Sequence, residues 1–189
     1  MRLLIAGGAG FLGTHLCERL TSEGHYVICV DNFITGSMNN LCDIASPVYH
    51  HPRFRVVDCD ITQPINPTLF GEHVDEIYHL ASIASPEKYK KYSMETLLTS
   101  INGTQRVLEY CVLYNCKMLF TSTSEVYGDP LVSPQPETYW GNVNPIGPRG
   151  VYDEAKRYAE AMTMAYHNVH KMDTRIVRFF NTYGPRMRL

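Results

Sequence analysis

Short apolar runs rich in valine, isoleucine and leucine alternate along the chain with longer segments of helical periodicity. This alternation is typical of repeated β-α-β units, in which helices cover both faces of a parallel sheet. The apolar runs predict strands at residues 2–6, 26–31, 54–58, 75–80, 117–122 and 174–179. The longer segments predict helices at residues 11–23, 63–70, 94–115 and 151–170, with a weaker candidate at 38–45.

Right-handed crossovers between these units give an α/β fold with a doubly wound parallel sheet, the Rossmann fold, in the strand order 3-2-1-4-5-6. The length of 189 residues fits one domain that spans residues 1–189. Ligands of such sheets bind beyond the carboxyl ends of the strands, where the two halves of the sheet diverge. Proline and glycine are frequent in residues 129–150, so we predict a long irregular loop there.

The composition narrows the class of ligand. A formal charge of −2 at pH 7 provides no broad electrostatic attraction to nucleic acid or to an anionic membrane. The six cysteines are scattered without paired spacing, which favours reduced thiols over a metal site or a disulfide framework. Glycines interrupt the apolar N-terminal run, and no run approaches the ~18 apolar residues that span a bilayer. We therefore expect a cytoplasmic protein with a small-molecule ligand and no metal.

Three glycines follow the first predicted strand. Gly7, Gly10 and Gly13 are spaced three residues apart, which permits a tight turn, close approach of a pyrophosphate and close packing of helix on strand. Asp31 ends the second strand about 20 residues later, where a carboxylate can bond the adenosine ribose hydroxyls and repel a 2′-phosphate. The combination favours NAD over NADP, although each feature by itself could be an ordinary structural turn.

Further cofactor contacts are expected after the third and fourth strands. Asp60 and Ile61 could bond and flank an adenine ring, or could equally be a turn cap and a core residue. The small residues after His79 would let the backbone approach the cofactor, and His79 itself is interpreted as a strand-end residue without a catalytic role.

A candidate catalytic group lies in the second half of the chain. Tyr152 and Lys156 are four residues apart at the start of a helical pattern, so their side chains share one face. A tyrosine with a pKa near ~10 is a poor base at neutral pH, and a nearby ammonium favours its phenolate form. Lys156 would supply that charge, while Thr123, at the end of the fifth strand, would bond the substrate hydroxyl that loses its proton. A surface helix that carries a tyrosine and a lysine is the alternative.

These motifs resemble those of a known family. Residues 7–13, residues 123–128 and the pair Tyr152 and Lys156 resemble the glycine and active-site motifs of the extended short-chain dehydrogenase/reductase family, and the resemblance covers the whole chain. Within this family, the chain more narrowly resembles the UDP-glucuronic acid decarboxylase branch, at residues 121–130, 139–141, 144–149, 152–154 and 180–187. Sugar-nucleotide 4,6-dehydratases carry Asp-Glu where this chain has Ser124 and Glu125, and decarboxylation needs no such acid.

The resemblance implies an NAD-dependent reaction in which UDP-glucuronate is oxidised at C4, loses carbon dioxide and is reduced to UDP-xylose. By resemblance, Tyr152 is the C4 acid/base, Lys156 its activator and ribose ligand, and Thr123 the hydroxyl partner. Ser124 and Glu125 would orient the sugar or handle the C5 proton. The implied cofactor residues are Gly7, Gly10, Phe11, Leu12, Gly13, Asp31, Asn32, Phe33, Asp60, Ile61, Leu80, Ala81, Ser82, Tyr152 and Lys156.

The resemblance also implies substrate contacts by Tyr89, Arg149 and Asn181, although Asn181 could be a strand-end turn residue and Arg149 a solvated loop charge. It implies a homodimer through the helices at 94–115 and 151–170, whose apolar stripes could instead face the sheet. The family has a smaller C-terminal substrate lobe that is largely absent from this chain, so we expect NAD binding with weak or absent turnover. The alternatives are a non-catalytic nucleotide-binding or partner-binding module, and a related sugar-nucleotide epimerase or dehydratase.

Overall fold

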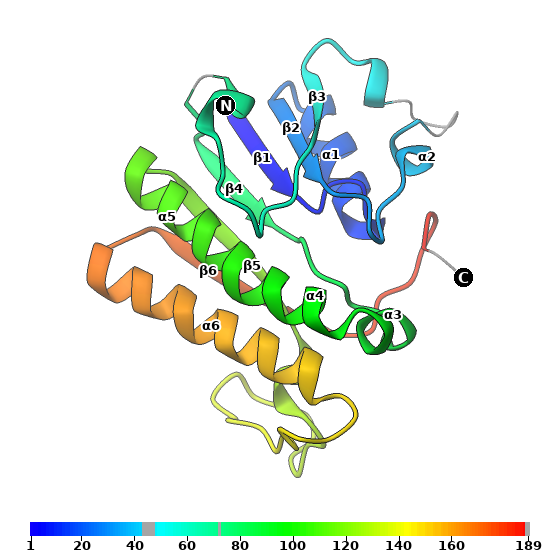
Figure 1. The fold of residues 1–189 in the computed structure, drawn as a ribbon, viewed down its shortest axis with the longest axis vertical. Helices are drawn as coiled ribbons and strands as arrows, with labels where there is room; N and C mark the ends of the chain where they lie inside the picture. Colours follow the sequence, from blue (N-terminus) through cyan, green and yellow to red (C-terminus); the bar gives the residue numbers. More distant parts are fainter. Residues whose placement is uncertain (43–47, 72, 188–189) are drawn as a thin grey trace.

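The computed structural model describes residues 1–42, 48–71 and 73–187. It contains one six-stranded parallel sheet with helices on both faces (Figure 1). The sheet order is β3-β2-β1-β4-β5-β6, which confirms the predicted doubly wound topology. The strands are β1 (Arg2–Ala6), β2 (Tyr26–Asp31), β3 (Phe54–Asp58), β4 (Glu76–His79), β5 (Lys117–Thr123) and β6 (Thr174–Phe179).

The helices fall in two layers. In Figure 1, α4, α5 and α6 lie in front of the sheet, whereas α1 lies behind its N-terminal half. The α-helices are α1 (Phe11–Ser22), α2 (Met38–Leu41), α3 (Pro86–Lys91), α4 (Ser93–Leu98), α5 (Thr104–Tyr114) and α6 (Gly150–His170). Short helical segments of other types are η1 (Val48–His50), η2 (Pro67–Phe70), η3 (Thr99–Gly103) and η4 (Ser124–Tyr127).

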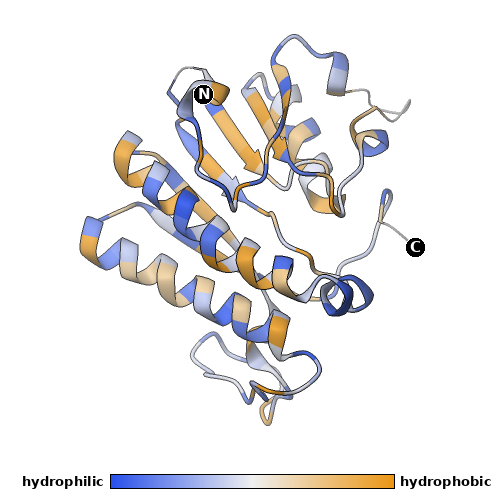
Figure 2. Ribbon diagram, viewed as in Figure 1, coloured by the Kyte–Doolittle hydropathy of each residue, from blue (hydrophilic) through white to orange (hydrophobic). Residues whose placement is uncertain are grey.

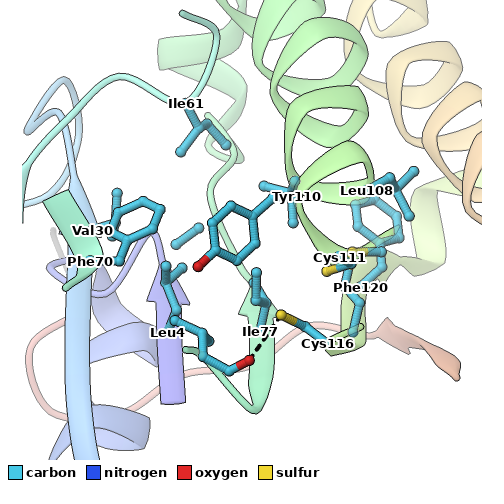
Figure 3. Packing of buried hydrophobic residues seen from close by; sticks show 14 of the residues in the cluster. Leu4, Val30, Ile61, Phe70, Ile77, Leu108, Tyr110, Cys111, Cys116 and Phe120 are labelled. Atoms are coloured by element: carbon cyan, nitrogen blue, oxygen red, sulfur yellow. Dashed lines mark hydrogen bonds between the residues drawn. The ribbon is translucent and has the colours of Figure 1, made fainter. Parts of the chain in front are cut away.

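Alternate residues of the central strand enter two separate hydrophobic cores. Leu3 and Ile5 belong to the cluster that includes Cys17 and Leu20 of α1, whereas Leu4 belongs to the cluster that includes residues of α5. Figure 3 shows this second core, in which the rings of Phe70 and Tyr110 meet edge to face with centroids 5.6 Å apart. Because both faces of the strand are buried from Leu3 to Ala6, this part of its sequence is apolar throughout, and Figure 2 shows the hydrophobic colour along β1.

Some predicted helices are wrong or differ in form. The helix predicted at 63–70 is wrong: the structure has only the short segment η2, because Pro64 and Pro67 lack backbone donors. The predicted helix at 94–115 is divided, since η3 is a π-helical turn between α4 and α5. The weaker helix at 38–45 is confirmed for Met38–Leu41, and residues 43–47 lie outside the described residues.

The sequence prediction missed α3, which follows β4. Ser85 is its N-cap and accepts a hydrogen bond from the Lys88 backbone amide at 3.4 Å, and Pro86 occupies its first turn. Proline is favourable in a first turn, because the amide that it lacks would have no partner within the helix. The helix places Tyr89 against Tyr152 near the start of α6.

Two irregular segments complete the edge of the sheet at the carboxyl ends of the strands. Residues 129–149 form the predicted loop, which projects below α6 in Figure 1. The segment after β6 turns back to α1, where the Pro185 carbonyl lies 3.0 Å from His15 Nε2 and Arg186 pairs with Glu18 at 2.8 Å. Within the described ranges, no helix is long and apolar enough to cross a membrane.

Candidate functional site

A cavity of about 540 Å³ opens at the carboxyl ends of the strands, where the β1 and β4 halves of the sheet diverge. This is the position expected for the ligand of a doubly wound sheet. The predicted site residues that line it are Gly7, Gly10, Phe11, Leu12, Gly13, Asp31, Asn32, Asp60, Ile61, Leu80, Ala81, Ser82, Tyr89, Thr123, Ser124, Glu125, Arg149, Tyr152, Lys156 and Asn181. Phe33 differs: its side chain packs against the core cluster beneath α1.

The glycine turn joins β1 to α1 with very little space. Gly7 has φ +82°, and a Cβ there would lie 2.6 Å from the Ala81 backbone nitrogen. A Cβ on Gly13 would lie 2.1 Å from the Gly7 carbonyl oxygen. Side chains at these positions would therefore push apart the turn, the helix and the segment after β4. The close packing leaves the N-terminus of α1, with its unpaired backbone amides, at the wall of the cavity, where an anion can bind.

Asp31 fixes its carboxylate at the end of β2. Its Oδ2 accepts a hydrogen bond from the Ala9 amide at 3.0 Å, and Oδ1 accepts one from the Phe33 amide at 2.9 Å. Burial raises the pKa of Asp31, while these backbone hydrogen bonds oppose the rise. Gly36, which sequence reasoning missed, lies directly against the carboxylate, since a Cβ there would be 2.8 Å from Oδ1.

Asp60 and Ile61 have the structural roles of a turn cap and a core residue, and their contacts with an adenine ring stay a prediction. Asp60 Oδ1 accepts a hydrogen bond from the Thr62 amide at 2.9 Å, so Asp60 caps a turn while it lines the cavity. Ile61 is a member of the core cluster shown in Figure 3, and it also lines the cavity. The core and the cavity therefore share this wall.

Tyr152 is buried at the start of α6 and stacks on Tyr89, with ring centroids 5.1 Å apart and an interplanar angle of 4°. Burial raises the pKa of Tyr152 to about 12, while the nearby hydroxyl groups of Thr123 and Ser82 act in the opposite direction. Two hydroxyl groups, one at the end of β5 and one after β4, therefore lie near the phenol. Sequence reasoning identified Thr123 as a hydroxyl partner and Ser82 only as a cofactor contact.

Lys156 is buried one helical turn after Tyr152. Its Nζ donates a hydrogen bond to the Thr121 carbonyl at 2.8 Å and lies 4.9 Å from the centroid of the Phe120 ring. Burial lowers the pKa of Lys156 to about 8, and the charge of Glu160 opposes this effect. The surroundings of Lys156 therefore bring its pKa close to neutral pH.

His79 lies behind the site and is fully buried. Its Nε2 is 3.1 Å from Thr104 Oγ1, and burial followed by the charge of Lys156 lowers the pKa of His79 to about 3. The ring is therefore neutral at physiological pH. This environment agrees with the absence of an assigned catalytic role.

Glu125 and Arg149 form an ion pair at the mouth of the cavity. Glu125 belongs to η4, whose N-cap Thr123 accepts a hydrogen bond from the Glu125 amide at 3.3 Å. Arg149 immediately precedes α6. A carboxylate and a guanidinium from segments about 25 residues apart in the chain are therefore brought together beside Tyr152.

Several lining residues were not predicted. Thr99 reaches the cavity from the π-helical turn η3, which cannot be read from a continuous helical pattern. Arg186 and Met187 reach it because the segment after β6 folds back over α1. Only the resemblance at residues 180–187 drew attention to that segment.

The model of the "NAD dependent epimerase/dehydratase family" matches residues 3–188. The chain belongs to this family. Membership confirms the predicted extended short-chain dehydrogenase/reductase class, and NAD is the cofactor of the family. The cavity fits that cofactor, because a glycine turn that no Cβ could enter, a helix N-terminus and a buried carboxylate at the end of β2 lie along one wall.

Curated proteins similar to this chain include UDP-glucuronic acid decarboxylases. UDP-glucuronic acid decarboxylase 5 from Arabidopsis thaliana is 50% identical over 190 residues, which cover 100% of this chain and 53% of that protein. UDP-glucuronic acid decarboxylase 1 from Xenopus tropicalis is 48% identical over 191 residues and is covered to 42%. The chain thus spans about half the length of the curated relatives it matches.

The similar solved structures include epimerases and dehydratases. UDP-glucuronic acid 4-epimerase from Bacillus cereus, in complex with NAD, has a TM-score of 0.82 and 30% identity, with 100% of this chain and 59% of that chain covered. The dTDP-glucose 4,6-dehydratase DesIV from Streptomyces venezuelae, with NAD bound, has a TM-score of 0.85 and 30% identity, with 99% and 58% covered. These likenesses agree with the doubly wound fold.

Proposed function

We propose that this chain is the cofactor-binding and catalytic portion of an NAD-dependent UDP-glucuronate decarboxylase that forms UDP-xylose. The observation that carries the proposal is the identity of 50% across the whole chain to a UDP-glucuronic acid decarboxylase, against 30% to an epimerase and a dehydratase of the same fold. The residues around the cavity support the same reaction.

Three parts of the cavity would hold NAD. The turn at Gly7 and the N-terminus of α1 would bind the pyrophosphate, and Asp31 would accept hydrogen bonds from the adenosine ribose. Lys156 would donate to the second ribose, beside Tyr152. When bound, NAD supplies the acceptor for the hydride from C4 of the sugar and later returns that hydride.

Tyr152 is the proposed base for the C4 hydroxyl. The protein alone raises the pKa of its phenol to about 12, so phenolate formation at neutral pH needs nearby positive charge and hydrogen-bond donors. The nearby hydroxyl groups of Thr123 and Ser82 oppose the rise in the pKa. The Lys156 ammonium, one helical turn away, would add the positive charge. Removal of the C4 hydroxyl proton by Tyr152, together with loss of the hydrogen on C4 as hydride, would leave a ketone at C4.

Glu125 and Arg149 are proposed to act on the next step. A ketone at C4 is β to the C6 carboxylate, so the C5–C6 bond breaks with loss of carbon dioxide and its electron pair forms an enolate. A proton is then added at C5, which Glu125 or Ser124 is placed to direct. Arg149 neutralises Glu125, which would otherwise repel the carboxylate of the substrate.

Product analysis separates the proposed reaction from those of the related enzymes. The protein is incubated with NAD and UDP-glucuronate, and the product is identified by NMR. We expect UDP-xylose, which has lost C6. UDP-galacturonate would instead identify an epimerase, and absence of any product from protein with NAD bound would favour a non-catalytic binding module.

We also propose a cytoplasmic homodimer. Support for the dimer comes from exposed apolar side chains on two adjacent helices, Met94 and Leu98 on α4 and Tyr158 and Met164 on α6. Support for the cytoplasmic location comes from the cysteines, which are free thiols, as expected in a reducing compartment. Sedimentation at several concentrations would show a dimer in the micromolar range, and a monomer at every concentration would contradict the proposed association.

A further inference from the structure

A partly buried ion pair joins β6 to α6 and takes no direct part in the proposed reaction. Arg178 in β6 and Glu160 in α6 form a two-pronged contact, with Nε–Oε1 2.9 Å and Nη2–Oε2 2.7 Å. Burial alone would raise the pKa of Glu160, but the hydrogen bonds and charge of Arg178 outweigh it and hold the pKa below its usual range. The carboxylate is therefore ionised at neutral pH.

Arg178 also contacts the segment that carries Ser124 and Glu125. Its Nη1 donates to the Tyr127 hydroxyl at 2.8 Å and to the Glu137 carbonyl at 3.2 Å, and its guanidinium lies 4.9 Å from the centroid of the Tyr127 ring. Tyr127 is the last residue of η4, and Glu137 belongs to the loop at 129–149. One side chain therefore joins β6, α6, η4 and the loop.

Glu160 lies one helical turn after Lys156. Residues four apart on a helix are neighbours, with Cβ atoms roughly 5–6 Å apart. Two other titratable groups lie near Lys156: His79 on β4, whose pKa the charge of Lys156 lowers, and Tyr152, one turn earlier on α6. Both are neutral in the protein alone, so Glu160 is the group whose charge favours the ammonium.

We propose that Glu160, oriented by Arg178, is a positioning residue that keeps Lys156 protonated and fixes its helix relative to η4. The inference rests on the proposed function, in which a charged Lys156 favours the Tyr152 phenolate and binds the ribose. Burial of Lys156 disfavours its ammonium, so the enzyme needs a compensating anion that does not itself enter the cavity. Glu160 meets this condition because its charge is held by Arg178 behind the cavity.

The test measures the protonation of Lys156 directly. Lysine labelled with ¹³C at Cε reports its ionisation by NMR, and the Lys156 resonance is assigned with Lys156→Arg. We expect Glu160→Gln, which keeps the shape but removes the charge, to lower the pKa of Lys156 by about one unit. Glu154→Gln is the matched control on α6: Glu154 is partly exposed and pairs with Arg157 at 3.7 Å, so this variant should leave the pKa of Lys156 unchanged.

A shape-changing variant separates charge from packing. Glu160→Asp retains the charge at a greater distance from Arg178, so it should lower the pKa of Lys156 by less than the Gln variant does. If Glu160→Gln fails to fold, the comparison of Glu160→Asp with wild type still decides. An unchanged Lys156 pKa in the folded Glu160 variants would overturn the proposal and leave the pair a structural contact.

The activity profile is a second and independent readout. We expect the basic limb of the kcat/KM profile to move to lower pH in Glu160→Gln by the same shift that NMR measures. The NMR titration needs neither NAD nor substrate, so the two proposals can fail separately. If Glu160→Gln lowers the pKa of Lys156 but the wild-type protein does not decarboxylate UDP-glucuronate, the proposed function is contradicted and the positioning role is supported. If the wild-type protein decarboxylates UDP-glucuronate but Glu160→Gln leaves the pKa of Lys156 unchanged, the proposed function is supported and the positioning role is contradicted.

Discussion

At the scale of the residue, burial shifts the pKa values of the two side chains proposed to act in catalysis. Tyr152 and Lys156 are both buried, and burial raises the pKa of the first to about 12 and lowers that of the second to about 8. Both shifts favour the neutral side chain. The reactive forms, phenolate and ammonium, therefore depend on partners such as Thr123, Ser82 and Glu160, and on bound NAD.

Tyr152→Phe removes the proposed base and leaves the ring that stacks on Tyr89. We expect NAD affinity to stay within a few-fold of wild type and decarboxylation to fall about 100- to 10,000-fold, the usual range for loss of a general acid or base. A calorimetric titration with NAD and a rate measurement give the two quantities. Turnover above a tenth of the wild-type rate would remove Tyr152 from the mechanism.

His79 provides a prediction for stability against pH. Its pKa is about 3 in the folded protein and near ~6.5 in the unfolded chain, so only the unfolded chain gains a proton as the pH falls through this range. The contribution to stability is complete above pH 6.5 and is lost towards pH 3. The stability difference between wild type and His79→Gln should shrink by about 2 kcal/mol from pH 7 to pH 5. Parallel denaturation curves at the two pH values would contradict this account.

Individual residues were predictable where one chemical role needs one residue type at one spacing. The glycine turn, Asp31, Tyr152 and Lys156 satisfy that condition, and all line the cavity. Phe33 does not line the cavity, and this could not be predicted, because its position close to Asp31 in the sequence does not determine the direction of its side chain. Glu160 and Arg178 were missed because their contact joins a helix to a strand, which a local pattern cannot reveal.

At the scale of the element, the strands were predictable because their apolar runs are buried on both faces. The helices were less predictable than the strands. Prolines converted the segment at 63–70 into η2, and a π-helical turn interrupted the segment at 94–115. Both changes preserve much of the local apolar pattern, so periodicity could not detect them.

The glycine turn between β1 and α1 is expected to have two functions, close packing of the turn at Gly13 and approach of the cofactor at Gly10. A methyl group on Gly13 would collide with backbone, so Gly13→Ala should lower the free energy of unfolding by about 3 kcal/mol. Gly10 has φ −79°, and a Cβ there would lie 3.3 Å from the Gly7 carbonyl oxygen, which requires only a small adjustment.

Gly10→Ala should therefore change stability by less than about 1 kcal/mol, yet weaken NAD binding at the wall of the cavity. Denaturation curves and NAD titrations of the two variants measure both effects. If Gly13→Ala were as stable as wild type, or if Gly10→Ala bound NAD normally, the assignment of packing to one glycine and cofactor approach to the other would be wrong.

At the scale of the whole molecule, the topology gathers residues from the ends of all six strands around one cavity. The residues proposed to bind the cofactor and those proposed to act in catalysis line this same cavity. The chain spans about half the length of its curated relatives, so the proposed reaction concerns the part of the site that these residues form.

The most direct test of the proposed reaction follows the carbon that should leave. The protein, in excess over substrate and saturated with NAD, is mixed with UDP-glucuronate labelled in the carboxyl group, and released carbon dioxide is trapped. The account predicts NAD-dependent release of label, slow but measurable, which Tyr152→Phe abolishes. Absence of labelled carbon dioxide from protein that demonstrably binds NAD, or equal release by the variant, would contradict it.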